Sequence, residues 1–272
     1  MDKKVILITG ASAGIGKAFA EELLKDGHTV YGAARRVDKM EAMTSQGIKT
    51  LAMDVTDEQT MTNGIDTIIK AEGRIDVLIN NAGFGLLGAI EDVYMSDARY
   101  QLEVNLFGAA RLTQLVLPHM RKQRSGTIIN ISSIGGKFSM ALGGWYHASK
   151  FALEAMSDAL RNEVKQFGIN VVVIEPGGIQ SEWGGIAVDN LLKISGEGPY
   201  SSIAKKFANA FTQSIDAKLP GPIVIANLVR KAIASKKPKT RYHAGHMAGL
   251  ALFMRWLLPD NTFDKLMTSQ LK

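Results

Sequence analysis

The chain has 272 residues, of which 46% are hydrophobic and 21% are charged, and it contains no cysteine. These values are typical of a globular protein, and the length can bury a core without disulfide or metal staples. The lack of cysteine excludes thiolate catalysis, cysteine–zinc sites and disulfides, and it favours a reducing, cytoplasmic compartment. The formal net charge of +6 is not gathered into a dense basic run with interleaved aromatics, so we expect no nucleic-acid partner.

The sequence does not predict a membrane anchor. The apolar run within Met1–Gly10 is short and leads directly into glycines, unlike a signal peptide. No stretch reaches the roughly 18 apolar residues that a spanning helix needs. The most apolar piece, Met247–Leu258, is interrupted by Arg255.

Short, nearly continuous apolar runs predict buried parallel strands. They are Val5–Thr9, Thr29–Ala33, Lys49–Met53, Val77–Asn80, Thr127–Ile131 and Val171–Glu175. Longer patterns with helical periodicity separate them, at Ile15–Asp26, Asp57–Glu72, Ala98–Lys122 and Tyr146–Phe167. Strands that alternate with helices predict βαβ units and therefore an α/β fold with a doubly wound parallel sheet.

The regular alternation ends after Pro176. Glycines and polar residues at Gly177–Pro199 predict a mobile loop, and helix-like patterns follow at Ile203–Phe211 and Pro222–Ala234. A connection as long as residues 181–220 is usually functional, and we expect it to form a substrate lid. The apolar C-terminal tail at about 243–272 leaves three alternatives, which are packing on the domain, a subunit contact, or contact with a membrane surface.

Glycines cluster between the first predicted strand and the first predicted helix. Gly10, Gly14 and Gly16 let the backbone turn tightly and approach a phosphate, while the helix N-terminus offers free N–H groups and a positive dipole end. This placement favours a dinucleotide site over plain turn chemistry. The same stretch also fits the G-x-S-x-G nucleophile elbow of serine hydrolases through Ser12, although no histidine has an evident triad setting.

Two arginines follow the second predicted strand, where NAD-binding proteins usually carry an acidic residue. Arg35 and Arg36 suit the 2′-phosphate of NADP, because a guanidinium makes planar, charge-assisted contacts with a phosphate. The alternative is that both arginines are solvated loop residues. The sequence therefore favours NADP(H) over NAD(H).

A tyrosine and a lysine stand four residues apart at the start of the last long predicted helix. Tyr146 and Lys150 then share one helix face, where the ammonium is expected to lower the pKa of the phenol toward a range useful for proton transfer. Upstream, Ser132 and Ser133 end the strand Thr127–Ile131 at the sheet edge that faces a ligand crevice. We favour Ser133 as the hydroxyl that supports a developing oxyanion, with Ser132 as the alternative.

Taken together, these motifs resemble the short-chain dehydrogenase/reductase family in its compact one-domain type. The resemblance covers roughly residues 3 to 182 and rests on Thr9–Gly16 as T-G-x-x-x-G-x-G, Asn80–Gly83, Asn105, Ser133, Tyr146 with Lys150, and Pro176-Gly177. It implies a single Rossmann-like, dinucleotide-binding catalytic domain over residues 1–272, with a three-layer sheet of about seven strands. It also implies hydride transfer between NADP(H) and a carbonyl or secondary alcohol.

The resemblance assigns roles to individual residues. Asn105, Ser133, Tyr146 and Lys150 would be catalytic, with Tyr146 transferring the proton and Asn105 holding a water that relays protons to Lys150. The residues expected to bind the cofactor are Gly10, Ser12, Gly14, Ile15, Gly16, Arg35, Arg36, Asp54, Val55, Asn81, Ala82, Gly83, Tyr146, Lys150, Pro176, Gly177, Ile179 and Ser181. Many NADP-preferring relatives carry Arg or Lys at Ala13, so here the 2′-phosphate contact depends more heavily on the two arginines. No metal site is expected.

The substrate is less well defined by the sequence. Apolar residues after Ser181 and in Met140–Trp145 suit a small lipophilic carbonyl compound, and they are equally compatible with ordinary core. By resemblance, we expect a homodimer or homotetramer that pairs through Ala98–Lys122 and Tyr146–Phe167. A cofactor-sensing protein without turnover is the alternative from another class, and the complete set of four catalytic residues argues against it.

Overall fold

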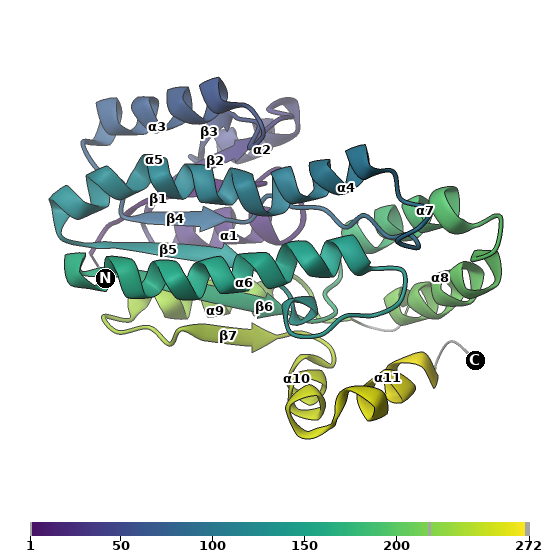
Figure 1. Ribbon diagram of the computed structural model, residues 1–272. Helices are drawn as coiled ribbons and strands as arrows, with labels where there is room; N and C mark the ends of the chain where they lie inside the picture. Colours follow the sequence, from purple (N-terminus) through teal and green to yellow (C-terminus); the bar gives the residue numbers. More distant parts are fainter. Residues whose placement is uncertain (1, 217–218, 270–272) are drawn as a thin grey trace.

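The computed structural model describes residues 2–216 and 219–269, and its centre is one parallel sheet (Figure 1). Within these residues, seven strands lie in the order β3-β2-β1-β4-β5-β6-β7, and every neighbouring pair is parallel. The strands are β1 (Val5–Thr9), β2 (Thr29–Ala34), β3 (Lys49–Ala52), β4 (Val77–Asn80), β5 (Gly126–Ile131), β6 (Ile169–Pro176) and β7 (Arg241–Ala244). The predicted Rossmann-like α/β fold is confirmed.

Helices cover both faces of this sheet (Figure 1). One layer contains α1 (Gly14–Lys25), α2 (Glu41–Ser45) and α9 (Ile223–Ala234), and the other contains α3 (Glu58–Glu72), α5 (Gly108–Gln123) and α6 (Gly144–Val164). Strand β1 shows why there are two layers. Ile6 and Ile8 pack with α1 and α9, whereas Val5 and Leu7 pack with α3 and α5, so the strand is buried on both faces.

The strand order reverses between β1 and β4. The chain first builds β2 and β3 on one side of β1 and then crosses to β4 and β5 on the other side. In sheets of this kind, ligands bind in the crevice outside the carboxyl ends of the strands at the reversal. Thr9, Asn80 and Ile131 end the strands β1, β4 and β5 at that edge.

The structure corrects the prediction of a mobile loop at Gly177–Pro199. Helix α7 occupies Trp183–Ser195, most of that range, and it packs on α8 (Ser201–Asp216). Its buried residues Ala187, Val188 and Leu191 provide an apolar face that overrides the helix-breaking tendency of the glycines at its start.

Two further differences concern single elements. The helix predicted at Ala98–Lys122 is divided into α4 (Met95–Leu102), a π-helical turn at Glu103–Phe107, and α5. The seventh strand, β7, had no predicted position, because only Tyr242 of its four residues is buried and the segment lacks an apolar run.

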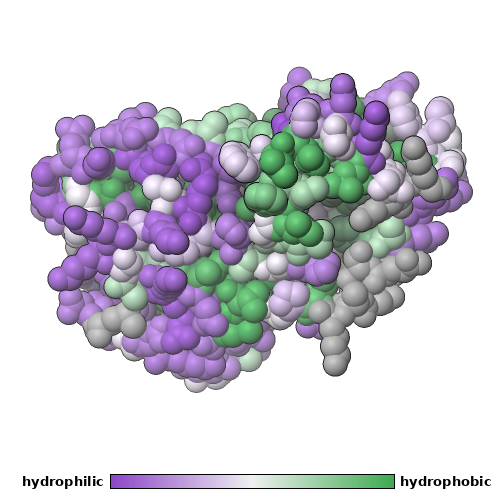
Figure 2. Space-filling view, turned by 90° about the horizontal axis from the view of Figure 1, so that it is seen from below, coloured by the Kyte–Doolittle hydropathy of each residue, from purple (hydrophilic) through white to green (hydrophobic). Residues whose placement is uncertain are grey.

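The C-terminal segment forms two helices, α10 (Ala248–Leu257) and α11 (Asp260–Ser269). It packs on the domain through Phe263 of α11, which is buried and lies 5.3 Å from Phe138 between ring centroids. Helix α10 leaves Phe253 and Trp256 exposed. Figure 2 shows a hydrophobic patch on the face of the molecule seen from below. None of the helices in the described ranges has both the length and the apolar character to cross a membrane.

Candidate active site

The glycine-rich turn after β1 forms a cradle for an anion. Gly10 (φ 65°) and Gly14 (φ 55°) adopt left-handed backbone conformations that favour glycine. A Cβ on Gly16 would lie 2.3 Å from the Gly10 carbonyl oxygen, so a side chain does not fit there. Ala13 precedes α1 without a side-chain capping bond, which leaves the first N–H groups of the helix free for a phosphate. Ser12 lies within this same turn.

Asn81 fixes the cradle to the end of β4. Its Nδ2 donates to the carbonyl oxygens of Thr9 (2.8 Å) and Gly10 (3.2 Å), and the Ala82 N–H donates to the Thr9 hydroxyl (3.0 Å). The Oδ1 atom of Asn81 is buried and has no hydrogen-bond partner among the described residues. An unpaired buried acceptor beside a glycine cradle fits the hydroxyl-bearing ribose of a dinucleotide.

Arg35 and Arg36 are both exposed just beyond β2. Arg35 donates to the Tyr100 hydroxyl at 3.1 Å, and because this partner is neutral, the guanidinium charge stays available for a phosphate. The position thus suits the 2′-phosphate of NADP.

The pair Asp54–Val55 follows β3 and forms a tight local structure. Asp54 Oδ1 accepts from the backbone N–H (2.9 Å) and hydroxyl (2.8 Å) of Thr56. Val55 is buried against Gly108, where an added Cβ would lie 2.5 Å from the Val55 carbonyl oxygen. Contact of this pair with an adenine stays a prediction.

Ser133 and Tyr146 face each other where β5 ends. Ser133 begins the short 3-10 turn Ile134–Gly136, and its Oγ accepts from the Gly135 N–H at 3.0 Å. Burial raises the pKa of Tyr146, and a hydrogen bond with Ser133 opposes that shift only in part. The side chain of Ser132 is directed toward Gly136, where an added Cβ would lie 2.8 Å from Ser132 Oγ. This Oγ is buried and has no hydrogen-bond partner among the described residues.

Lys150 is buried one turn further along α6. Its Nζ donates to the Ile131 carbonyl oxygen at 2.9 Å. Burial lowers the pKa of Lys150 to about 8, and the negative charge of Glu154 opposes this shift. The expectation that Lys150 lowers the pKa of the Tyr146 phenol is wrong for this arrangement, because the phenol is desolvated and the ammonium is directed to the end of β5.

Asn105 lies in the π-helical turn between α4 and α5, a local irregularity that is frequent at functional sites. Its Oδ1 accepts from the Phe84 N–H (3.0 Å), and its Nδ2 donates to the Phe84 carbonyl oxygen and to the Ser149 hydroxyl (3.0 Å each). A Cβ on Gly83 would lie 3.1 Å from Asn105 Oδ1 and 3.7 Å from Lys150 Nζ. The glycine therefore brings the backbone after β4 close to both side chains.

The segment after β6 borders the site on the side of β5. The Ser133 hydroxyl donates to the Pro176 carbonyl oxygen at 3.5 Å, and the Gly177 N–H donates to the Ala244 carbonyl oxygen at 2.8 Å. The predicted nicotinamide segment is thus fixed between Ser133 and β7.

Further along this segment, Ser181 returns to the glycine cradle, with its Cβ 3.9 Å from the position of a Cβ on Gly14. The side chain of Ile179 instead packs against the core beside Gly245. Only the backbone of Ile179 is then placed to meet a cofactor.

An apolar pocket adjoins Tyr146. It is lined by Leu87, Met140, Ala141, Gly143, Tyr146, His147, Trp183, Phe207 and Phe211. The ring centroids of Tyr146 and Trp183 are 5.3 Å apart. The sequence indicated Trp183 and the stretch Met140–Trp145, but it did not indicate the contributions of Leu87, His147 and α8. The i, i+4 spacing of Phe207 and Phe211 is the signal that could have found the last of these.

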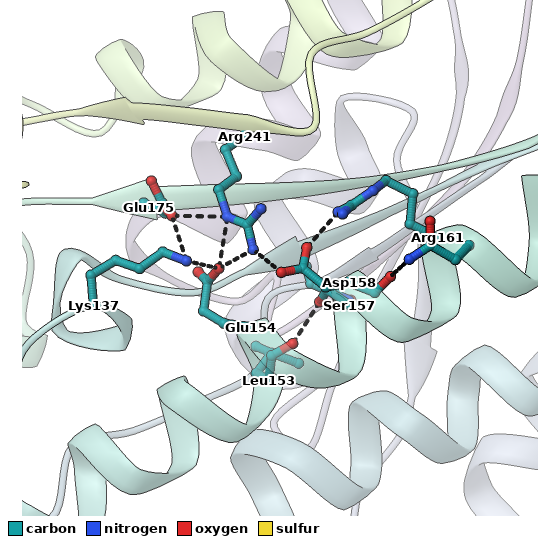
Figure 3. Close-up of polar contacts among 10 residues, drawn as sticks. Lys137, Leu153, Glu154, Ser157, Asp158, Arg161, Glu175 and Arg241 are labelled. Atoms are coloured by element: carbon teal, nitrogen blue, oxygen red, sulfur yellow. Dashed lines mark hydrogen bonds and ion pairs between the residues drawn. The ribbon is translucent and has the colours of Figure 1, made fainter.

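A second group of charges surrounds the buried carboxylates of Glu154 on α6 and Glu175 on β6 (Figure 3). We call it the charge cluster; it consists of Lys137, Glu154, Asp158, Arg161, Glu175 and Arg241. Glu154 pairs with Lys137 (2.9 Å) and Arg241 (3.0 Å). Burial and the neighbouring Glu154 raise the pKa of Glu175 to about 7. The sequence did not indicate this cluster, because its members are far apart along the chain.

Comparison with known proteins places the chain among oxidoreductases. The family model described as short chain dehydrogenase matches residues 4–191. The chain is 36% identical over 270 residues to the 3-ketodihydrosphingosine reductase of Bacteroides thetaiotaomicron, covering 96% of this chain and 95% of that protein. It is 34% identical over 281 residues to the NADPH-dependent 3-dehydrocapnine reductase of Ornithobacterium rhinotracheale, covering 98% and 96%.

A solved structure supports the same relationship. A short-chain dehydrogenase from Streptomyces avermitilis superposes with a TM-score of 0.83 at 32% identity, covering 99% of this chain and 98% of that one. This family membership also removes the serine hydrolase alternative at Ser12, since that residue lies in the glycine turn before α1. The chain belongs to the short-chain dehydrogenase family of oxidoreductases.

Proposed function

We propose that this protein is an NADP(H)-dependent reductase that interconverts a ketone and a secondary alcohol on a small lipophilic substrate. The proposal depends above all on one arrangement. Ser133 lies close enough to Tyr146 to lower the pKa of its phenol, and the buried Lys150 lies one turn further along α6, all at the sheet edge beside the glycine cradle. A cofactor sensor would have no use for this arrangement.

The roles follow from the chemistry of each side chain. Ser133 and Tyr146 hold the substrate oxygen, and Tyr146 donates a proton to it as negative charge develops. Tyr146 is protonated at neutral pH, because burial raises a phenol pKa that already lies well above 7, and the protonated form is the one needed to reduce a ketone. Bound NADPH supplies the hydride. Lys150 returns a proton toward Tyr146, and Asn105 holds the path by which water reaches Lys150.

The cofactor residues are those predicted from the sequence. The cradle of Gly10, Ser12, Gly14, Ile15 and Gly16 would hold the pyrophosphate, and Asp54, Val55, Asn81, Ala82 and Gly83 would flank the adenosine. Pro176, Gly177, Ile179 and Ser181 would meet the nicotinamide side. Arg35 and Arg36 would bind the 2′-phosphate, and the NADPH dependence in the name of a relative 34% identical to this chain supports that preference.

The substrate is proposed to be a ketone with an aliphatic chain. The pocket beside Tyr146 is apolar, and the names of two relatives specify a keto or dehydro compound. Its volume of about 40 Å³ is far below the roughly 300–1,000 Å³ of ligand pockets. Substrate entry therefore requires α7 and α8 to move, which is the lid function expected for residues 181–220.

We also propose a cytoplasmic homo-oligomer. Phe107 and Phe151 lie on the helices expected to pair and are 53% and 44% exposed, so each offers an apolar side chain that a partner helix can cover. Analytical ultracentrifugation of the wild-type protein and of Phe151→Glu tests this pairing. A wild-type monomer at micromolar concentration would contradict it.

The cofactor proposal is tested by initial rates over a panel of long-chain ketones with NADPH and NADH in parallel. Replacing Arg35 and Arg36 together by Ser should raise the KM for NADPH by roughly 10- to 100-fold, since charged hydrogen bonds are lost. The KM for NADH should change little. Equal use of both cofactors by the wild type would contradict the NADP preference, and binding of NADPH without oxidation of any substrate would favour the sensor.

A further inference from the structure

His147 follows Tyr146 directly and is buried on α6, with 4% of its surface exposed. Its Nδ1 lies 2.8 Å from the Gly135 carbonyl oxygen. A carbonyl oxygen only accepts hydrogen bonds, so Nδ1 carries the proton. Burial lowers the pKa of His147, which keeps the ring neutral at pH 7 and leaves Nε2 with a lone pair.

His147 lines the apolar pocket, and the hydrogen bonds among the described residues engage its ring at Nδ1 only. The Nε2–Cδ2 edge of the ring lies along Gly143, another lining residue, where an added Cβ would be 2.8 Å from Nε2. Apart from Tyr146 and His147, the lining side chains are aliphatic, aromatic or thioether groups. Nε2 is then a strong acceptor on a wall that is otherwise nearly apolar.

The position of His147 is fixed relative to the reacting oxygen. A Cβ on Gly135 would lie 2.8 Å from His147 Nδ1 and 3.4 Å from Ser133 Oγ, so Gly135 separates the imidazole from the serine hydroxyl by about one residue width. The ring centroids of Tyr146 and His147 are 5.5 Å apart. If Ser133 and Tyr146 hold the substrate oxygen, the rest of the substrate occupies the pocket that Tyr146 and His147 line together.

We infer that His147 determines substrate specificity by accepting, at Nε2, a hydrogen bond from a hydroxyl or ammonium on the carbon adjacent to the reacting carbonyl. This inference rests on the proposed function and narrows its substrate class to α-hydroxy or α-amino ketones with an aliphatic tail. An acceptor in a nearly apolar pocket penalises a bound ketone that lacks the donor, because the ketone then covers Nε2 without giving it a partner.

The test compares kcat/KM for three matched long-chain ketones: an unsubstituted one, its α-hydroxy analogue and its α-amino analogue. We expect the wild type to favour at least one donor-bearing ketone by 10-fold or more, chiefly through KM. The His147→Phe variant should reduce that ratio to about 2 or less, since Phe fills the same space without an acceptor, and His147→Gln should restore part of it. The analogue that the wild type prefers shows whether the donor is a hydroxyl or an ammonium group.

Two further variants keep the result interpretable if His147→Phe folds poorly. Gly143→Ala places a methyl group against Nε2 and should also reduce the preference, although His147 itself is intact. Phe138→Leu alters packing beside the imidazole, 6.4 Å away between centroids, and should keep the preference. A wild-type ratio near 1, or a preference that survives in both His147→Phe and Gly143→Ala, would overturn the inference while leaving the reductase activity in place. No NADPH oxidation with any of the three ketones would instead contradict the proposed function.

Discussion

Two buried charged side chains lie one turn apart on α6, Lys150 and Glu154, and they differ in how their charge is balanced. In the candidate active site, Lys150 Nζ donates to a backbone carbonyl oxygen, and burial lowers its pKa to about 8. In the charge cluster, Glu154 contacts both Lys137 and Arg241, and Arg241 also contacts Asp158 at 2.7 Å (Figure 3). Glu154 stands four residues after Lys150, so one helical turn separates the two arrangements.

The difference indicates which group serves chemistry and which serves the fold. A buried lysine without a hydrogen-bonded carboxylate costs stability, and such strongly perturbed groups concentrate at functional sites. The charge cluster joins α6 and β7 and the strand end of β6 through paired charges, which is how buried ions are usually tolerated. Changes in the two groups should therefore affect different properties.

The largest effect is expected for Lys150→Met. The kcat/KM for ketone reduction should fall on the order of 10³-fold, because the proton path to Tyr146 is lost.

The folded-state pKa of Lys150, about 8, lies below the ordinary 10.5, so the unfolded chain binds more protons between those values. The free energy of unfolding of the wild type should therefore rise with pH in this range. Urea titrations from pH 7.5 to 10.5 should show this rise in the wild type only. A variant with normal turnover would contradict the functional role of Lys150.

The Arg241→Ala variant tests the charge cluster. Removing the guanidinium leaves Glu154 and Glu175 close together and underpaired, and we expect the free energy of unfolding to fall by about 3 kcal/mol. Urea denaturation measures this loss. Arg161→Ala is the matched control, because its partner Asp158 is 42% exposed, and it should change stability by less than about 1 kcal/mol. Equal effects of the two variants would show that the cluster is not a buried network.

A smaller effect is expected for Glu175→Gln. The folded-state pKa of about 7 lies above the ordinary 4.5, so the folded state binds more protons than the unfolded chain between these values. Wild-type stability should decline as pH rises through that window, and the glutamine variant should lose this decline. Thermal melts from pH 4.5 to 7.5 check it. Identical pH profiles for the wild type and the variant would contradict the raised pKa.

The sequence predicted the central sheet well because buried parallel strands have a simple signal. The strands Val5–Thr9 and Val77–Asn80 are apolar almost throughout, and their bounds agree with the structure. Strand β7 lacks that signal, since Arg241 and His243 interrupt it. Helix α7 was predicted as loop because Gly184 and Gly185 lie in its first turn, whereas its stability comes from tertiary packing on α8.

The residues of the candidate site could be predicted where they belong to one short sequence motif. Tyr146 and Lys150 are joined by helical spacing, and the glycines by their place after β1. His147 had no such pattern, since its meaning depends on the carbonyl oxygen of Gly135 and on a pocket made by distant helices. The tautomer of His147 follows from its hydrogen bond to Gly135, and the raised pKa of Tyr146 follows from burial; a linear sequence specifies neither.

The most direct test of the central claim separates cofactor binding from turnover in Tyr146→Phe. We expect NADPH to bind this variant with a Kd within about threefold of the wild type, measured by fluorescence titration, while single-turnover reduction slows on the order of 10³-fold or more. Near-normal single-turnover reduction in Tyr146→Phe would contradict the claim that this phenol delivers the proton.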